Sequence, residues 1–485
     1  MDFSGKTDKN TAVGSFLWKF LERIFSQGVN MVVQIVLARL LLPEDFGGLA
    51  ILVAITNYAA IFVQSGLATS IVQKQELDEQ DVSTVLTASL VVSLVMYVVL
   101  FVASPLIAGF YAKPELKWTL RVLALVLFLN SINSVQTAVL SRRMQFKKLF
   151  LRSALSVPIS GAVGIVMAVM GFGLWALVAH NLVNMLVIVL FMSFGKDMHF
   201  PLRFFPKRAK VIYGFSGKIL ITSLITGFHD TLRTMVIGKK YSTVDLAYYD
   251  KAYAYSNYAT QIINASISGV LLPVFSRAQN NLVQLRGMVR RSVKLTSFIM
   301  CPILLGIVAV AKPLVQVLLT DKWLESVPYL MVFCLLRLPG CLVNSDKQVY
   351  YAIGKSGINM FYEIGLFILN ITTLVATMRH STIAIAIGAT VVEYIGCFTI
   401  WIISTRTYGY KVLDRLKDIV KPVVNSTIMA VSVWGLGCIG MPPLFSLVVQ
   451  VGAGAAVYYL LALLTRDENL NYVTNMLTMF IRDKT

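Results

Sequence analysis

Two uninterrupted apolar stretches constrain this chain more than any other feature. Residues 82–102 and 161–192 contain no Asp, Glu, Lys or Arg. An apolar run of about 18 residues is long enough to cross a bilayer as a helix, which satisfies its own backbone hydrogen bonds. Only 14% of all residues are charged, whereas soluble proteins carry about 25%. The sequence therefore predicts an all-α protein embedded in a membrane.

Turn residues divide the apolar sequence into about fourteen predicted spans. Proline and glycine mark several of the joints, among them 42–45, 112–114 and 441–443. The predicted spans are residues 11–41, 47–72, 82–110, 116–140, 152–171, 173–195, 212–238, 244–272, 292–319, 327–351, 357–378, 381–404, 418–440 and 443–465. The expected fold class is an all-α, polytopic membrane protein with about fourteen transmembrane helices.

The net charge of +19 is concentrated in short loops between the predicted spans. Three of these loops, at 142–152, 203–210 and 277–291, hold most of the clustered Lys and Arg. Basic loops on one side of a membrane are typical of the cytoplasmic side. The pattern predicts a multi-pass protein of the bacterial inner membrane with both termini in the cytoplasm. Nucleic-acid binding is not expected, because no aromatic stacking platform accompanies the basic loops.

The chain also resembles itself at an offset of 200 residues. Thr56-Asn57-Tyr58-Ala59 corresponds to Ser256-Asn257-Tyr258-Ala259, and Gly14 to Gly214. This register predicts two parallel six-helix lobes, with chance similarity between apolar segments as the alternative. The expected divisions are an N-terminal lobe at 1–195, a basic cytoplasmic linker at 196–211, a C-terminal lobe at 212–404, two further spans in 405–465 and a cytoplasmic tail at 466–485. Transporters built from repeats bind substrate near the bilayer midplane between the repeats.

Polar residues recur every three or four positions along the first predicted span. They are Ser15, Lys19, Glu22, Arg23, Ser26, Asn30 and Gln34. This spacing puts them on one helix face, and polar residues within a membrane usually face a wet cavity or a partner. We therefore expect Lys19, Arg23, Asn30 and Gln34 to line a substrate cavity. The alternatives are a Lys19–Glu22 pair and extension of the Lys19 amine to the membrane surface.

The seventh predicted span carries a similar polar face. Its members are Ser216, Ser223, Thr226, Asp230 and Arg233. Matching polar faces in the two lobes predict a central hydrophilic cavity, and Asp230 and Arg233 are its candidate residues on this span. A structural ion pair between those two side chains is the alternative.

Further candidates lie on other predicted spans. The repeat singles out Asn57 and Asn257 as cavity residues, while Tyr255 and Tyr258 are deep enough to stack on a sugar. Arg337 could hold an anionic substrate. The carboxylates of Glu363 and Glu393 are candidates for ion coupling, and an Arg337–Glu393 structural pair is the alternative.

No enzyme signature is found in the sequence. The chain has no GxxxxGK[ST] phosphate loop, no HExxH and no GxSxG. No Cys/His cluster has a metal-binding spacing. The sequence predicts a non-enzymatic protein without a metal or other cofactor.

Several short motifs resemble the polysaccharide transporter family of oligosaccharide flippases, in the superfamily of multidrug and lipid flippases. The motifs are Ala38-Arg39, Pro43-Glu44-Asp45-Phe46-Gly47, Gln64-Ser65-Gly66-Leu67-Ala68, Ile71-Val72-Gln73, Met144-Gln145-Phe146, Leu272-Pro273-Val274-Phe275-Ser276-Arg277, Asp321-Lys322-Trp323 and Ala352-Ile353-Gly354-Lys355. They are spread over most of the chain, although the last two predicted spans conform less well.

This resemblance implies that the chain moves an undecaprenyl-diphosphate-linked oligosaccharide between the leaflets of the inner membrane, for surface or exopolysaccharide or lipopolysaccharide biosynthesis. The polyprenyl-linked sugar and membrane lipids are then its partners, and a polysaccharide polymerase complex is a further candidate. A cation-coupled multidrug antiporter and a lipid II flippase are the alternatives within the superfamily. A membrane glycan polymerase or ligase is disfavoured, because no long outer loop is predicted to hold its active site.

Overall fold

The computed structural model describes residues 9–64, 71, 77–193 and 201–470, which form helices and short connections without any strand in that part of the chain. The side chains at 9–17, 19, 20, 210–219, 221, 222, 225, 226, 262, 263, 265–270, 272 and 273 lie outside the description. The predicted all-α fold class is therefore confirmed. Packing divides the chain into two units, Met1–Ala247 and Tyr248–Thr485.

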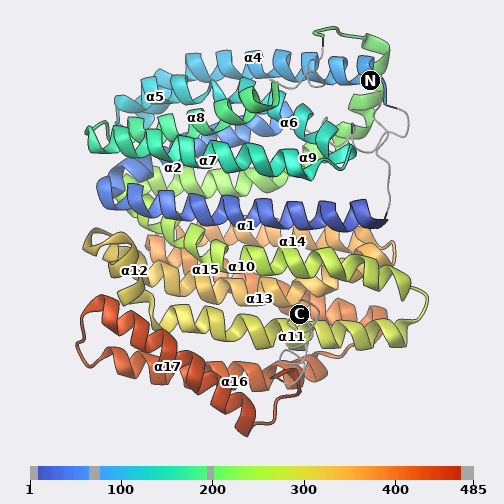
Figure 1. Ribbon diagram of the computed structural model, residues 1–485, viewed down its shortest axis with the longest axis vertical. Helices are drawn as coiled ribbons and strands as arrows, with labels where there is room; N and C mark the ends of the chain where they lie inside the picture. Colours follow the sequence, from blue (N-terminus) through green and yellow to red (C-terminus); the bar gives the residue numbers. More distant parts are fainter. Residues whose placement is uncertain (1–8, 65–70, 72–76, 194–200, 471–485) are drawn as a thin grey trace. The chain divides into compact units, whose positions relative to one another are not determined.

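The first unit contains eight described helices (Figure 1). They are α1 Lys9–Leu40, α2 Pro43–Gln64, α4 Glu79–Phe110, α5 Glu115–Leu123, α6 Val126–Arg142, α7 Phe146–Val169, α8 Leu174–Ser193 and α9 Pro206–Lys240. Close packing at glycines joins several of them. A Cβ atom added at Gly161 of α7 would lie 2.5 Å from the side chain of Val33 on α1. One added at Gly227 of α9 would lie 2.4 Å from Ile61 on α2.

The second unit begins within α10, at Tyr248. The remaining elements are α10 Thr243–Arg277, α11 Leu282–Ala309, α12 Ala311–Leu319, the 3₁₀ helix η2 Asp321–Ser326, α13 Val327–Ala352, α14 Ser356–Thr377, α15 Thr382–Tyr408, α16 Val412–Gly437 and α17 Pro443–Leu464. Helices α16 and α17, which correspond to the last two predicted spans, pack within this unit and contact α11. Packing groups α9 with α2 in the first unit. The expected boundary between the two lobes at 196–211 therefore stays a prediction.

The helix boundaries repeat at the offset expected from the sequence. Helix α1 ends at Leu40 and α9 at Lys240, whereas α2 begins at Pro43 and α10 at Thr243. When α9 is counted as the counterpart of α1, a short helix follows the third long helix of each copy, α5 after α4 and α12 after α11. The 200-residue register is therefore present in the secondary structure.

Two predicted spans are interrupted. The span expected at 116–140 is divided into α5 and α6, and the one at 292–319 into α11 and α12. The first division falls at Ala124 and Leu125, and no proline or glycine marks it in the sequence. Ala124 and Leu125 at the first division have helical dihedral angles, and Val310 at the second has φ −98° and ψ 10°. Each division is therefore a local break in helical hydrogen bonding.

Eleven helices of the described part are long and apolar enough to cross a membrane. Helices α1, α9 and α10 are also long, with 32, 35 and 35 residues, but carry more polar side chains. At 1.5 Å per residue, each exceeds the roughly 30 Å of a bilayer core. The chain is a multi-pass membrane protein, and the expected total of about fourteen spans is compatible with these helices.

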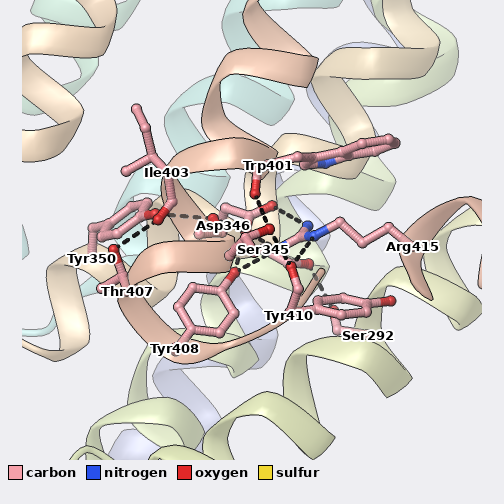
Figure 2. A network of polar contacts seen from close by, with 12 residues as sticks. Ser292, Ser345, Asp346, Tyr350, Trp401, Ile403, Thr407, Tyr408, Tyr410 and Arg415 are labelled. Carbon is pink, nitrogen blue, oxygen red and sulfur yellow. Dashed lines mark hydrogen bonds and ion pairs between the residues drawn. The ribbon is translucent and has the colours of Figure 1, made fainter. Parts of the chain in front are cut away.

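A buried ionic network holds one end of the second unit together (Figure 2). The charge pattern predicts that this end faces the cytoplasm. Arg415 of α16 donates to both oxygens of Asp346 on α13, at 2.9 and 2.6 Å, and both side chains are fully buried. Ser404 and Tyr408 of α15 also donate to Asp346. Tyr350 lies 2.9 Å from the Ser404 hydroxyl. One carboxylate is thus shared by three helices.

Further ion pairs fasten α16 to α11. Arg290 donates to both oxygens of Asp418 at 2.6 and 2.8 Å, and Tyr410 donates to the same carboxylate. Arg286 lies 3.5 Å from Asp414. Because buried pairs stabilise only when their hydrogen bonds are satisfied, these contacts fix the orientation of α16 within the second unit.

Candidate functional site

The first unit encloses a polar cavity of about 460 Å³ between its helices. Its lining consists of Ser26, Gln27, Asn30, Gln34, Val53, Thr56, Asn57, Gln64, Leu123, Val126, Asn130, Val157, His180, Asn181, Asn184 and Met185. Eight of these sixteen residues are Asn or Gln, and none is Lys, Arg, Asp or Glu. Small-molecule sites usually have volumes of about 300–1,000 Å³, so the cavity has the size of a ligand site.

Helical spacing explains how these side chains converge. Asn30 and Gln34 are four residues apart on α1 and so share one face. His180 and Asn184 have the same spacing on α8. Helix α8 approaches α7 closely at this level, since a Cβ atom on Gly164 would lie 3.0 Å from the Cβ of His180. The glycine thereby allows the polar face of α8 to reach the cavity.

Several lining groups have few hydrogen bonds within the protein. Asn184 donates to the hydroxyl of Ser160 at 3.1 Å, and Asn181 to the carbonyl of Leu177 at 2.9 Å. In contrast, the Asn57 and Asn130 side chains make no hydrogen bond among the described residues. Asn57 is exposed at the cavity and Asn130 is 8% exposed, so both amides are open to water or to a polar ligand.

The buried Arg152 lies one helical turn away from the lining residues of α7. Its Nη1 donates to the side chains of Asn133 and Thr137 on α6, at 2.8 and 3.1 Å. Beside it, Ser153 donates to Glu22 of α1 at 3.1 Å. These contacts tie α1, α6 and α7 together next to the cavity, and they keep the charged groups out of its lining.

The residues predicted for the first span separate into two groups. Asn30 and Gln34 line the cavity together with Asn57 of α2. Arg23 is exposed and does not line it. The side chain of Lys19 lies outside the described residues.

The seventh predicted span corresponds to α9, where the ion pair that was the alternative to cavity lining is present. Arg233 lies 3.2 Å from Asp230, and His229 lies 3.5 Å from the same oxygen. The Asp230 side chain is 63% exposed, whereas that of Arg233 is 12% exposed. A carboxylate this exposed remains accessible to other cations.

The remaining sugar and anion candidates lie in the second unit. The rings of Tyr255 and Tyr258 meet edge to face with centroids 6.0 Å apart, and Asn257 is half-buried beside them on α10. The guanidinium of Arg337 lies 4.4 Å from the ring centre of Tyr253. Its Nε and Nη2 have no hydrogen-bond partner among the described residues. This cation is therefore held by an aromatic face and not by a carboxylate.

The two carboxylates proposed for ion coupling have different environments. Glu363 accepts a hydrogen bond of 2.6 Å from Lys347 and is 48% exposed. Glu393 is half-buried on α15. In the described part, no group of three His, Cys, Asp or Glu residues has a geometry suited to a metal ion.

Six of the eleven polar lining residues were not expected from the sequence. The missed polar residues are Gln27, Gln64, Asn130, His180, Asn181 and Asn184. A search for intramembrane charges overlooks them because they are neutral. The available signal was the spacing of His180, Asn181 and Asn184 in an otherwise apolar helix.

Sequence and structure comparisons agree with this architecture. The chain is 26% identical over 342 residues to the succinoglycan biosynthesis transport protein ExoT of Rhizobium meliloti, covering 70% of this chain and 68% of that protein. It is 23% identical over 420 residues to the teichuronic acid biosynthesis protein TuaB of Bacillus subtilis, covering 84% and 86%. The fold is similar to that of the lipid II flippase MurJ in an inward closed conformation. The TM-score is 0.77 at 15% identity, over 93% of this chain and 99% of the flippase.

The family model described as "Polysaccharide biosynthesis protein" matches residues 36–328. This match includes the last five residues of α1, helices α2 to α9 and the beginning of the second unit. Since it covers more than half of the chain, the protein belongs to the polysaccharide biosynthesis protein family of membrane transporters.

Proposed function

We propose that this protein is a flippase that moves an undecaprenyl-diphosphate-linked oligosaccharide across the bacterial inner membrane by alternating access. The observation that carries the proposal is the amide-lined cavity in the first unit. Asn and Gln side chains offer both donors and acceptors, as sugar hydroxyls do. No bond of the substrate is broken, so the activity is transport and not catalysis.

The membrane fold suits a substrate with a polar head and a lipid tail. In the proposed cycle, the sugar enters the cavity while the polyprenyl chain stays in the bilayer. Rocking of the two predicted lobes would then expose the head group to one side of the membrane at a time. The basic loops favour a cytoplasmic location for both termini.

The relatives support polysaccharide precursors as the substrate class. One is named for succinoglycan transport and another for teichuronic acid biosynthesis. We extend this class to the present chain, with surface or exopolysaccharide synthesis as its pathway. Association with a polysaccharide polymerase complex is part of the proposal.

The proposed roles of the site residues follow their chemistry. Asn30, Gln34, Asn57, Asn257, Tyr255 and Tyr258 contact the sugars, while Lys19, Arg23, Arg233 and Arg337 attract the diphosphate, with Asp230 orienting Arg233. Arginine suits this task because it forms charge-assisted hydrogen bonds with phosphate oxygens. Glu363 and Glu393 remain the proposed positions for ion coupling.

Reconstitution tests the proposal directly. The purified protein is placed in liposomes with a fluorescent undecaprenyl-diphosphate disaccharide, and an added glycosidase reports which head groups have reached the outer leaflet. Protein-dependent transfer is expected to exceed transfer in empty liposomes. Equal transfer with and without the protein would contradict the proposed function.

A lipid II flippase is the second candidate, favoured by the similarity of fold over nearly the whole chain. The same liposomes containing lipid II instead of the disaccharide distinguish the two. Faster transfer of lipid II would favour this second candidate. A multidrug antiporter is less well supported, because cationic drugs require carboxylates and the cavity lining contains none.

A further inference from the structure

The lining of the first-unit cavity differs from that of a site for an anion. Its polar groups are amides, hydroxyls and one imidazole, with no Lys or Arg among them. The nearby cation of Arg152 is already engaged by Asn133 and Thr137 and does not line the cavity. Among the described residues of this lining, a ligand therefore meets no Lys or Arg cation.

Neutral amides distinguish hydroxyls from carboxylates by their hydrogen-bonding capacity. Each Asn or Gln presents a donor and an acceptor, and a hydroxyl can satisfy both. An ionised carboxylate only accepts, so the amide oxygens facing it would be left unsatisfied. Its desolvation would also have no cation to offset it.

Apolar side chains occupy the rest of the lining. They are Val53, Leu123, Val126, Val157 and Met185, and no Phe, Tyr or Trp is among them. Such surfaces contact C–H groups and methyl substituents without stacking. Amides interspersed with aliphatic groups match a sugar ring that carries hydroxyls, deoxy positions or N-acetyl groups.

We infer that the amide cavity between α1, α2, α6, α7 and α8 is a subsite for an uncharged sugar and rejects uronic acids. This inference rests on the proposed flippase function and specifies its substrate class. The diphosphate is recognised elsewhere on the chain, because the cavity lining has no cation for it.

Two matched substrates test the inference in proteoliposomes. One is undecaprenyl-diphosphate cellobiose, and the other is the same lipid carrying cellobiuronic acid, in which one hydroxymethyl group is a carboxylate. We expect the neutral lipid to be transferred about tenfold faster, a ratio equivalent to one lost interaction of moderate strength. Equal transfer, or faster transfer of the uronate, would overturn the inference while the proposed function stands. Transfer of neither lipid would overturn both.

A charge substitution sharpens the test. Asn57 lines the cavity from a position with room for a longer side chain. N57K is expected to change the transfer ratio toward the uronate by about tenfold. The control is N280K, which adds the same charge at an exposed turn after α10 and should leave the ratio unchanged. If N57K does not fold, N184K replaces it, and an unchanged ratio in a folded variant would contradict the assignment.

Discussion

The two units use the polar residues of their helices in different ways. In the second unit, Asp346 accepts hydrogen bonds from Arg415, Ser404 and Tyr408, and the ion pair is completely buried. In the first unit, the amides of Asn57 and Asn130 face a cavity without a hydrogen-bond partner among the described residues. One set of polar groups is satisfied within the protein, and the other is left available to a ligand.

This difference separates the polar residues that stabilise the fold from those that are available for function. A closed network has a large energetic effect because removing one member leaves the others buried and unpaired. An unpaired amide contributes little to folding and can even reduce stability. Its retention in a membrane protein is explained by a polar ligand.

The largest effect is expected from breaking the second-unit network. R415A would leave the carboxylate of Asp346 buried without its cation and should destabilise the protein by about 3–5 kcal/mol. Thermal melting of the purified protein in detergent measures the loss. The double variant D346L/R415L should melt at a higher temperature than R415A, since it leaves no unpaired charge. Wild-type stability in R415A would refute the role given to this pair.

The packing of the first unit is expected to be the next most sensitive feature. G161A adds a Cβ atom 2.5 Å from the side chain of Val33, and overpacking of this kind costs about 1–3 kcal/mol. G28A on α1 is the control, because no neighbouring atom lies within 4 Å of the added Cβ. Equal melting temperatures of the two variants would show that α1 and α7 tolerate separation here.

The cavity amides should affect transport more than stability. N130L removes a buried amide that has no described partner, so its melting temperature should be unchanged or raised. Transfer of the lipid-linked disaccharide should fall about tenfold. N425L is the matched variant, because Asn425 is buried and donates to Thr465 at 3.0 Å. It should lose about 1 kcal/mol of stability. A comparable loss of stability in N130L would contradict the claim that the cavity amides of the first unit do not stabilise the fold.

The smallest effect is expected at Glu363. E363Q removes a half-exposed ion pair with Lys347, and such pairs contribute about 0–1 kcal/mol. Melting temperature and proton-gradient-dependent transport are measured together. An unchanged melting temperature with lost coupling would support the proposed ion-coupling role. Wild-type coupling would exclude it.

The fold was largely predictable, because apolar runs, turn residues and basic loops report directly on membrane spans. The 200-residue register correctly indicated the matching ends at Leu40 and Lys240. The break between α5 and α6 was not predictable, since Ala124 and Leu125 are good helix formers.

The candidate site was predicted only in part. Periodicity on the first span identified Asn30 and Gln34 because a polar stripe is conspicuous there. Asn130 and Asn184 escaped notice because they are neutral, and only tertiary packing brings them together. The Asp346–Arg415 pair joins residues 69 positions apart, a separation over which local patterns carry no information.

Photo-cross-linking tests the central claim, that the amide cavity of the first unit holds the sugar. Undecaprenyl-diphosphate carrying a diazirine-labelled hexose is irradiated with the reconstituted protein, and labelled peptides are identified by mass spectrometry. We predict labels on cavity residues of α1, α6 and α8, with less labelling in the presence of excess unlabelled lipid-linked sugar. Competable labels confined to other helices, with none on these three, would contradict the assignment.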